Sequence, residues 1–262
     1  MQTSLRLLRP LLIREWRETY AGSFFGGAWN LVQPLLFVLL YWWVFSAVWK
    51  MRLPASGTDG SELPFIVFLL SAMLPWMAFQ ESLVRGVSSV VAKADVLRHS
   101  PFPAALYPLS RVLAAHGTYV LVMIVAWAAL WVAGMMPTTP WMLIAALLWL
   151  GLQALFALGL AWLLAALAVY LRDLIHAVAM VMTFLLFTAP ILYPLSQVPE
   201  AWRAVVWMHP FTPFAEGFHA ILLHGAMPSM LSVGLGFAYT ALALLLGYSL
   251  FRKLQAGFVD VL

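Results

Sequence analysis

Long apolar stretches separated by short polar segments make up most of this chain. Six of them are long enough to cross a bilayer as helices, which takes about 20 residues each. The pattern therefore predicts an all-α membrane protein with six transmembrane helices in a single domain. The predicted spans cover residues 30–49, 64–83, 106–134, 141–169, 174–194 and 230–251.

The N-terminal residues 5–20 show the pattern of an amphipathic helix instead. Leu12 and Trp16 fall on one face, whereas Arg14 and Arg17 fall on the other. A cationic face opposite an apolar face that carries aromatic rings is typical of helices in the membrane interface. We predict such an interface helix here; the alternative is a solvated, charge-rich lead-in to the first span.

Two connections are longer than turns. Residues 84–105 form a charged connection that Pro101 and Pro103 interrupt, because proline ends helices. Residues 195–229 carry four prolines and several aromatic residues, and each helical piece between the prolines is too short to span. The second connection therefore predicts a re-entrant or interfacial helix pair, which must be shielded by protein or line a watery cavity.

The distribution of Lys and Arg predicts the orientation of the chain. Short cytoplasmic loops of membrane proteins collect these residues. With both chain ends in the cytoplasm, only Lys50, Arg52 and Arg203 fall outside. The cytoplasmic set is then Arg6, Arg9, Arg14, Arg17, Arg85, Lys93, Arg98, Arg111, Arg172, Arg252 and Lys253.

Composition narrows the function further. Hydrophobic residues make up 64% of the 262 residues, charged residues make up 9%, and there is no cysteine. Thiolate metal sites and cysteine catalysis are therefore excluded. The sequence contains no Walker motif, so energy for any driven process must come from a partner or an ion gradient. No acidic residue falls clearly at a span centre, which argues against ion coupling.

Histidine and carboxylate chemistry has little support. Glu216 and His219 are spaced i, i+3, as in one arm of a di-metal carboxylate site, but such a site needs a second arm. We expect no metal; the preferred interpretation is an outer-surface helix whose polar residues face water. An intramembrane transferase would need paired acids, or a histidine with an acid at a reachable depth. No convincing pair is present, and we predict no catalytic residue.

Aromatic residues are the positive signal. Many lie at span ends, as in the aromatic belt at the headgroup level. Others lie within spans or at their outer ends, where rings facing a pore could stack on sugars without a fixed hydrogen-bond pattern. Plain packing is the equal alternative. The predicted channel-lining residues are Tyr41, Trp42, Phe68, Phe79 and Tyr193.

Several short motifs resemble one family in order along nearly the whole chain. Arg17-x-x-Tyr20-Ala21, followed by Gly26, Trp29 and Pro34, is similar to the start of the first span in the transmembrane subunits of type-2 ABC polysaccharide exporters. Ser71-x-x-Leu74-Pro75-Trp76-x-x-Phe79-x-x-Ser82 resembles their second span. Tyr170-Leu171-Arg172-Asp173 and Thr188-Ala189-Pro190-Ile191-Leu192-Tyr193 resemble the two ends of their fifth span. His209-Pro210 resembles an Asn-Pro step, with histidine in place of asparagine.

The resemblance implies a permease without chemistry of its own. It implies a homodimer in the bacterial inner membrane, with a separate cytoplasmic ATPase that binds ATP and Mg²⁺. The cargo would be a lipid-linked glycan, O-antigen-like, with capsule, teichoic acid, drug or lipid export as alternatives and no nucleic-acid partner. Residues 84–105 would couple to the ATPase, and residues 195–229 would form an outer gate. The expected coupling residues are Arg14, Arg17, Lys93, Asp95, Arg98, Arg172 and Asp173.

Overall fold

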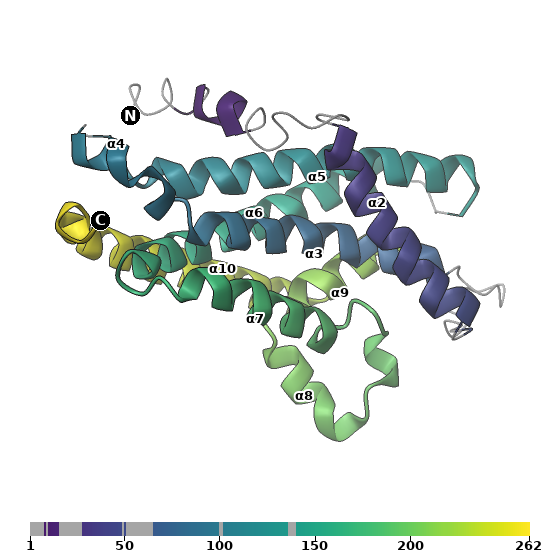
Figure 1. Ribbon diagram of the computed structural model, residues 1–262. Coiled ribbons are helices and arrows are strands. Elements are labelled where there is room, and N and C mark those ends of the chain that lie inside the picture. Colours follow the sequence, from purple (N-terminus) through teal and green to yellow (C-terminus); the bar gives the residue numbers. More distant parts are fainter. Residues whose placement is uncertain are drawn as a thin grey trace.

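The computed structural model describes residues 8, 10–15, 28–48, 50, 65–99, 102–135 and 140–262, and all regular secondary structure in these ranges is helical. This confirms the predicted all-α class. The long helices run side by side as a bundle (Figure 1). Of the N-terminal interface helix, residues 10–15 are described and are helical. Predictions that fall outside the described residues concern Arg6, Arg9, Trp16, Arg17, Tyr20, Arg52, Pro64 and Pro101.

Within the described residues, four helices are long and apolar enough to cross a membrane. The 23 residues of the shortest, α3, extend about 35 Å at 1.5 Å per residue, which exceeds the roughly 30 Å of a hydrocarbon core. The chain is therefore a multi-pass membrane protein. The four helices are α3 (Phe65–Val87), α5 (Leu106–Val132), α6 (Pro140–Tyr170) and α10 (Met230–Leu254).

Two further apolar helices are shorter. The first, α2 (Trp29–Trp42), continues into a π-helix, η2 (Trp43–Val48), and together they match the first predicted span. The other, α7 (Leu174–Thr188), ends at Thr188 rather than at residue 194. Pro190 is the reason, because a residue that precedes proline avoids the helical region, and Ala189 is extended with φ −83° and ψ 150°. Six complete spans therefore remain a prediction.

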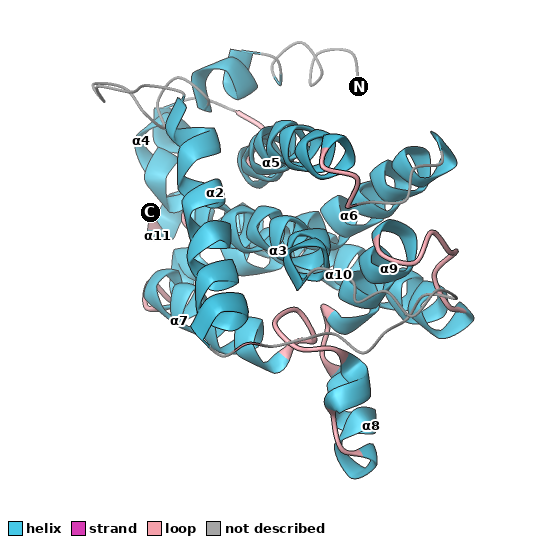
Figure 2. Cartoon of the chain, turned by 90° about the vertical axis from the view of Figure 1, so that its right-hand side faces the viewer, coloured by secondary structure: helices cyan, strands magenta, loops and turns pink. Residues whose placement is uncertain are grey.

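The central helix of the bundle is α3. In the end-on view of Figure 2 it lies in the middle, with α2, α5, α6 and α7 around it. Most of its side chains are buried, because its sequence is apolar around the helix up to Gln80, where the polar residues of its last turns begin. By contrast, α10 lies at the periphery and leaves most of its surface uncovered. Because α3 is largely covered by its neighbours, a ligand can contact only those of its side chains that are partly exposed.

A seam of small residues joins α6 to α10. Gly236, Thr240, Ala243 and Gly247 are buried positions of α10, about one turn apart. A Cβ atom added at Gly247 would overlap the carbonyl oxygen of Gly159 on α6. Small residues at this spacing let two membrane helices approach with their backbones in contact.

The predicted outer pair consists of two unlike helices, of which α9 (Thr212–Leu222) is the buried one. It packs against α3, α6 and α10. Trp149 of α6 anchors it: the indole N–H donates to the carbonyl oxygen of Phe214 over 3.1 Å, and the indole ring covers Gly217. The prolines and short length of α9 resemble a surface loop in sequence, yet this helix is part of the core.

The other member, α8 (Glu200–Met208), projects from the bundle (Figure 1). Trp202 is 62% exposed and Met208 is 75% exposed. The guanidinium of Arg203 donates to the carbonyl oxygens of Val198 and Ser196, which closes the turn before the helix. The re-entrant geometry and the role as a gate stay predictions.

The predicted cytoplasmic connection, residues 84–105, begins later than expected, since α3 continues to Val87. It then forms a 3-10 turn, η3 (Val91–Lys93), and a short helix, α4 (Ala94–His99). A second, smaller core holds this connection against the bundle; it comprises Val90, Ala104, Ala165, Ala166, Val169, Phe251, Phe258 and Leu262. Phe258 belongs to α11 (Phe258–Val261), so the C-terminal helix supports the connection.

Candidate functional site at the charged end of the bundle

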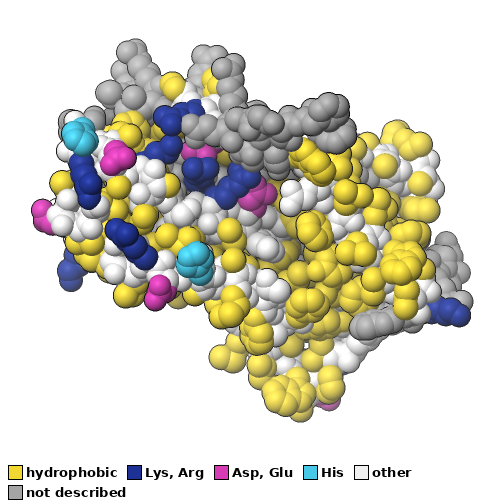
Figure 3. Space-filling view, in the orientation of Figure 1, with side chains coloured by type: hydrophobic (Ala, Val, Ile, Leu, Met, Phe, Trp, Pro, Cys, Tyr) yellow, Lys and Arg dark blue, Asp and Glu magenta, His cyan; other side chains and the backbone are white. Residues whose placement is uncertain are grey.

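Charged side chains gather at one end of the bundle, whereas the opposite end is mostly hydrophobic on the face shown in Figure 3. The charged end contains η3, α4, the α6–α7 turn and the last turn of α10. The described cations that were predicted to be cytoplasmic lie on these elements, on the adjoining ends of α3 and α5 or, for Arg14, on the N-terminal segment 10–15. Lys50 and Arg203, predicted to be outside, lie elsewhere.

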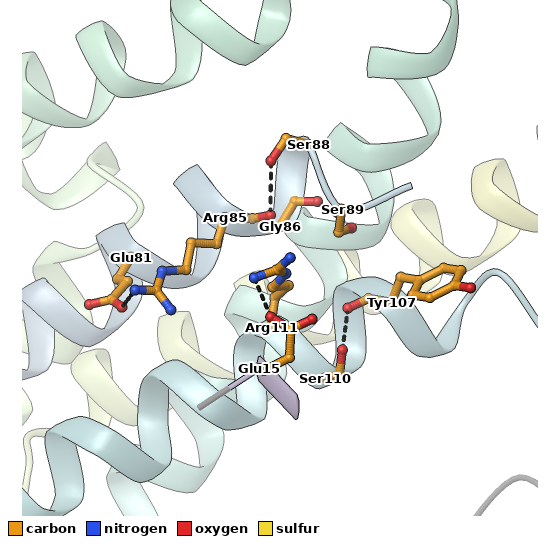
Figure 4. A network of polar contacts seen from close by, with 9 residues as sticks. All are labelled: Glu15, Glu81, Arg85, Gly86, Ser88, Ser89, Tyr107, Ser110 and Arg111. Atoms are coloured by element: carbon orange, nitrogen blue, oxygen red, sulfur yellow. Dashed lines mark hydrogen bonds and ion pairs between the residues drawn. The ribbon is translucent and has the colours of Figure 1, made fainter. Parts of the chain in front are cut away.

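An ion pair joins the N-terminal helical segment to α5. Arg111 of α5 contacts the carboxylate of Glu15, and Glu15 is only 3% exposed (Figure 4). Arg14, the neighbouring residue, is exposed and lies within electrostatic range of Tyr107. The segment 10–15 is therefore fixed across the charged end of α5 by a buried charge pair.

A second ion pair lies beside the first, in the last two turns of α3. The Arg85 guanidinium is 2.8 Å from the Glu81 carboxylate, and both side chains are about one quarter exposed. Figure 4 shows the Arg85 and Arg111 side chains next to each other on adjacent helices. The hydroxyl of Ser89 donates to the carbonyl oxygen of Gly86 over 2.6 Å, which satisfies the end of the helix.

A pocket of about 270 Å³ opens next to this second ion pair, between α2, α3 and α5. Its wall combines two amides, two hydroxyls and the ion pair with aromatic and aliphatic surface. The lining residues are Gln33, Pro34, Phe37, Met77, Gln80, Glu81, Val84, Arg85, Thr118 and Tyr119. The sequence marks Gln33, Gln80 and Glu81 as polar residues inside apolar spans, which is the signal that could have located the pocket.

The expected coupling residues lie at the same end but do not form one contact cluster. Lys93 is half-buried at the end of η3, whereas Asp95 and Arg98 are exposed on α4. Arg172 and Asp173 are exposed in the α6–α7 turn. These five residues lie on elements at the same end of the bundle, and their role stays a prediction. Sequence reasoning missed the pairing of Glu15 with Arg111.

The expected channel residues divide into two groups. Tyr41 and Tyr193 are half-buried and Trp42 is 38% exposed, so a partner or substrate could reach these rings. Phe68 and Phe79 are 3% and 1% exposed. Their rings pack inside the protomer, on the part of α3 that the neighbouring helices cover. The channel-lining role of all five residues stays a prediction.

The predicted water-facing arrangement of α9 is wrong for His219. This side chain is 4% exposed and stacks on Phe68 with ring centroids 4.2 Å apart. Its Nδ1 is 3.6 Å from the Glu216 carboxylate. Among the described residues, no group of three His, Cys, Asp or Glu side chains could hold a metal ion. The pair therefore contributes to packing of α9 in the core.

Comparison with known proteins decides the family. Residues 6–223 match the family described as ABC-2 type transporter. The chain belongs to this family of membrane subunits.

Three curated relatives are similar over most of their length. An O-antigen export system permease protein, RfbA, of Klebsiella pneumoniae is 26% identical over 100% of this chain and 98% of the relative. The RfbA protein of Myxococcus xanthus is 30% identical over 85% of the chain and 82% of the relative. The polysialic acid transport protein KpsM of Escherichia coli is 22% identical over 94% and 92%, respectively.

The step between α8 and α9 shows how this ABC-2 chain accommodates histidine. Nδ1 of His209 accepts the backbone N–H of Phe211 over 3.1 Å. In an Asx-turn, an asparagine side-chain oxygen likewise accepts the backbone N–H of the residue two positions later. His209 therefore reproduces the hydrogen bond that the resembling Asn-Pro step would make. Only a neutral imidazole can accept this bond, since both nitrogens of the charged form are donors.

We expect acid to loosen the α8–α9 step. Burial lowers the pKa of His209 from 6.5 to about 4. The folded state therefore binds this proton more weakly than the unfolded state, and stability is lost as the pH falls from 6.5 to 4, by up to roughly 3 kcal/mol. Thermal denaturation at a series of pH values should show a smaller loss for His209→Asn. The exposed His176→Asn should behave like the unmodified chain; equal pH dependence in all three proteins would contradict the assignment.

Proposed function

We propose that this chain is the permease subunit of an ATP-driven exporter that moves a lipid-linked, O-antigen-like polysaccharide across the bacterial inner membrane. The observation that carries the proposal is the similarity to O-antigen export permeases over the whole chain. The absence of a Walker motif from the sequence fits a subunit that depends on a separate ATPase. Capsule export is the second candidate, favoured by the similarity to a polysialic acid transport protein. Teichoic acid, drug or lipid export is a more distant alternative.

The proposed arrangement has six spans, with both chain ends in the cytoplasm. Beyond the four long helices, α2 with η2 and the short α7 would complete the set. The concentration of cations at one end supports this orientation. The ATPase would dock there, on the segment 10–15, on α4 and on the α6–α7 turn.

The proposed assembly is a homodimer. Apolar side chains remain uncovered on the shorter helices: Leu36 and Leu40 on α2, Trp43 on η2, and Phe184 on α7. A second copy of the chain would cover some of these surfaces, and Trp42 would then lie near the boundary between the protomers. This boundary is the proposed path for the glycan.

Genetic complementation tests the function. In a strain that makes an O-antigen but lacks its export permease, the chain is produced with its own ATPase partner, with an ATPase that cannot hydrolyse ATP, or alone. We expect surface glycan, detected by antibody on intact cells, only with the active partner. Surface glycan from the chain alone would exclude the proposal. Capsule in place of O-antigen in a matched capsule strain would favour the second candidate.

Reversing charge on the docking surface should uncouple the two subunits. At about 0.5 kcal/mol for each exposed ion pair, Arg14→Glu, Arg17→Glu and Arg98→Glu together should weaken docking roughly tenfold or more. We expect surface glycan to fall while the permease still inserts, as shown by its amount in membranes. Lys50→Glu, an exposed charge away from this surface, is the control. Normal export by the triple variant would disprove the docking assignment.

A further inference from the structure

The pocket between α2, α3 and α5 concentrates polar groups on helices that are otherwise apolar. Gln33 comes from α2, Gln80 and Glu81 come from α3, and Thr118 comes from α5. Polar and ionised side chains are costly within a membrane and usually face a cavity or a partner there. Three helices each contribute polar atoms to one small space, so the pocket is suited to a polar ligand rather than to an acyl chain.

The described residues that line the pocket carry no net charge. Among them, Arg85 is the one cation, and it lies 2.8 Å from the one anion, Glu81. A phosphate is bound most strongly by guanidinium groups whose positive charge is not already neutralised. A phosphate here would also lie close to the Glu81 carboxylate, and like charges at such distances repel. The charge balance therefore favours a neutral polar ligand over a phosphate.

The remaining groups match the hydroxyls of a sugar. A carboxylate accepts hydrogen bonds from two hydroxyl groups, and a primary amide both donates and accepts. The indole N–H of Trp76 donates to the side-chain oxygen of Gln80 over 2.9 Å, so the NH₂ group is the part of this amide that remains for a ligand. Phe37 and Tyr119 add aromatic surface to the same wall, next to these polar groups.

The size of the pocket sets a limit on the ligand. A volume of about 270 Å³ lies just below the usual range for small-molecule sites, roughly 300–1,000 Å³. One sugar ring is the largest unit that such a space suits. The opening adjoins Phe37, which is 44% exposed on α2, so an attached alkyl chain could extend along the apolar surface of this helix.

We propose that this pocket binds one neutral sugar residue at the head of a lipid-linked glycan. The proposal rests on the proposed function, because it deepens the cargo assignment to a sugar site within each protomer. Recognition relies on Glu81, Gln33 and Gln80, with Arg85 holding the carboxylate in place. A phosphate-bearing head group is the competing ligand, and the two differ in charge.

The absence of cysteine from the sequence makes a direct test feasible. Phe37→Cys places a single thiol at the pocket opening. Leu36→Cys places one on the same helix, 55% exposed at the unmodified residue and outside the pocket wall. Each variant, in complex with its ATPase in lipid nanodiscs, is reacted with a small thiol reagent. The probes are an alkyl glucoside and an alkyl phosphate of equal chain length.

The alkyl glucoside should protect Phe37→Cys. At about four times its Kd, one-site binding leaves roughly a fifth of the pockets open, so the labelling rate should fall about fivefold. The alkyl phosphate should have no effect, and Leu36→Cys should react equally fast in all conditions. Protection by both probes, by the phosphate alone or by neither would overturn the proposal, as would equal protection of Leu36→Cys.

Adding Glu81→Gln to Phe37→Cys gives a sharper result. This substitution keeps the shape but removes the negative charge of Glu81 from the pocket wall, next to Arg85. Protection should then shift from the glucoside to the alkyl phosphate; unchanged selectivity would contradict the role of charge balance. The labelling needs no export activity. If the glucoside protects the thiol but the complementation strain shows no surface glycan, the sugar site stands and the proposed export function is wrong. If surface glycan appears but the glucoside gives no protection, the export function stands and the sugar site is wrong.

Discussion

Replacing Gly247 by leucine should prevent the bundle from folding stably. Gly247 and Gly159 meet where α10 crosses α6, and even one Cβ atom at Gly247 would overlap the carbonyl oxygen of Gly159. The obstacle is backbone rather than a flexible side chain, so the helices must move apart along the whole seam. Overpacking of this kind costs about 1–3 kcal/mol and sometimes more. We expect Gly247→Ala to lower the denaturation temperature clearly and Gly247→Leu to abolish recovery of folded protein.

The same helices provide matched controls. A Cβ atom at Gly234 on α10, or at Gly151 on α6, would meet nothing within 4 Å. Gly234→Ala and Gly151→Ala should therefore leave stability within about 0.5 kcal/mol, the usual range for surface substitutions. Size-exclusion profiles after heating in detergent would compare all four variants. Alanine favours the helix more than glycine does, so helix propensity predicts no loss in any of these variants. If the control variants and Gly247→Ala lose stability equally, close packing at Gly247 is not the cause.

The long helices were predictable because an apolar stretch of membrane length has few alternatives to a helix. The predicted spans 106–134 and 141–169 lie within two residues of α5 and α6 at each end. The early end of α7 could also have been predicted, since Pro190 lies inside the predicted span. Proline at this position makes a helical conformation of Ala189 unfavourable. The helix therefore ends there, although the apolar residues that follow would favour a longer span.

The burial of side chains was harder to predict. Phe68 and Phe79 were predicted to line a channel from their position within a span, and their burial inside the protomer depends on the helices that pack on α3. The burial of α9 depends on Trp149, a residue more than 60 positions away in sequence. Neither the prolines nor the short length of α9 carries information about that partner.

The polar contacts also differ in how far the sequence alone predicts them. Glu81 and Arg85 are four residues apart on one helix, so their pairing follows from the sequence alone. Gln33 and Thr118 meet that pair only after α2 and α5 have packed on α3. Spacing along the chain therefore predicts a pair on one helix, whereas a pocket between three helices requires their relative positions.

Reversing the charge of Arg111 should detach the N-terminal segment, because Arg111 holds that segment to α5 through Glu15. Glu15 is 3% exposed, so Arg111→Glu would replace the cation beside a buried carboxylate by a second negative charge. Removing one partner of a buried ion pair costs about 3–5 kcal/mol. We expect the segment 10–15 to detach from α5, with loss of surface glycan but continued insertion of the four long spans. Protease accessibility of the N-terminal segment in inverted membrane vesicles measures the detachment.

Exchanging both charges separates a specific pair from a general need for arginine. The double variant Glu15→Arg with Arg111→Glu restores opposite charges in the same place, so it should regain much of the protection that Arg111→Glu loses. Arg111→Gln should be intermediate, because it removes the cation without adding an anion. If the double variant is as sensitive to protease as Arg111→Glu, then Arg111 acts through another contact. Recovery would instead make this ion pair the physical link through which a movement of the docked N-terminal segment reaches α5.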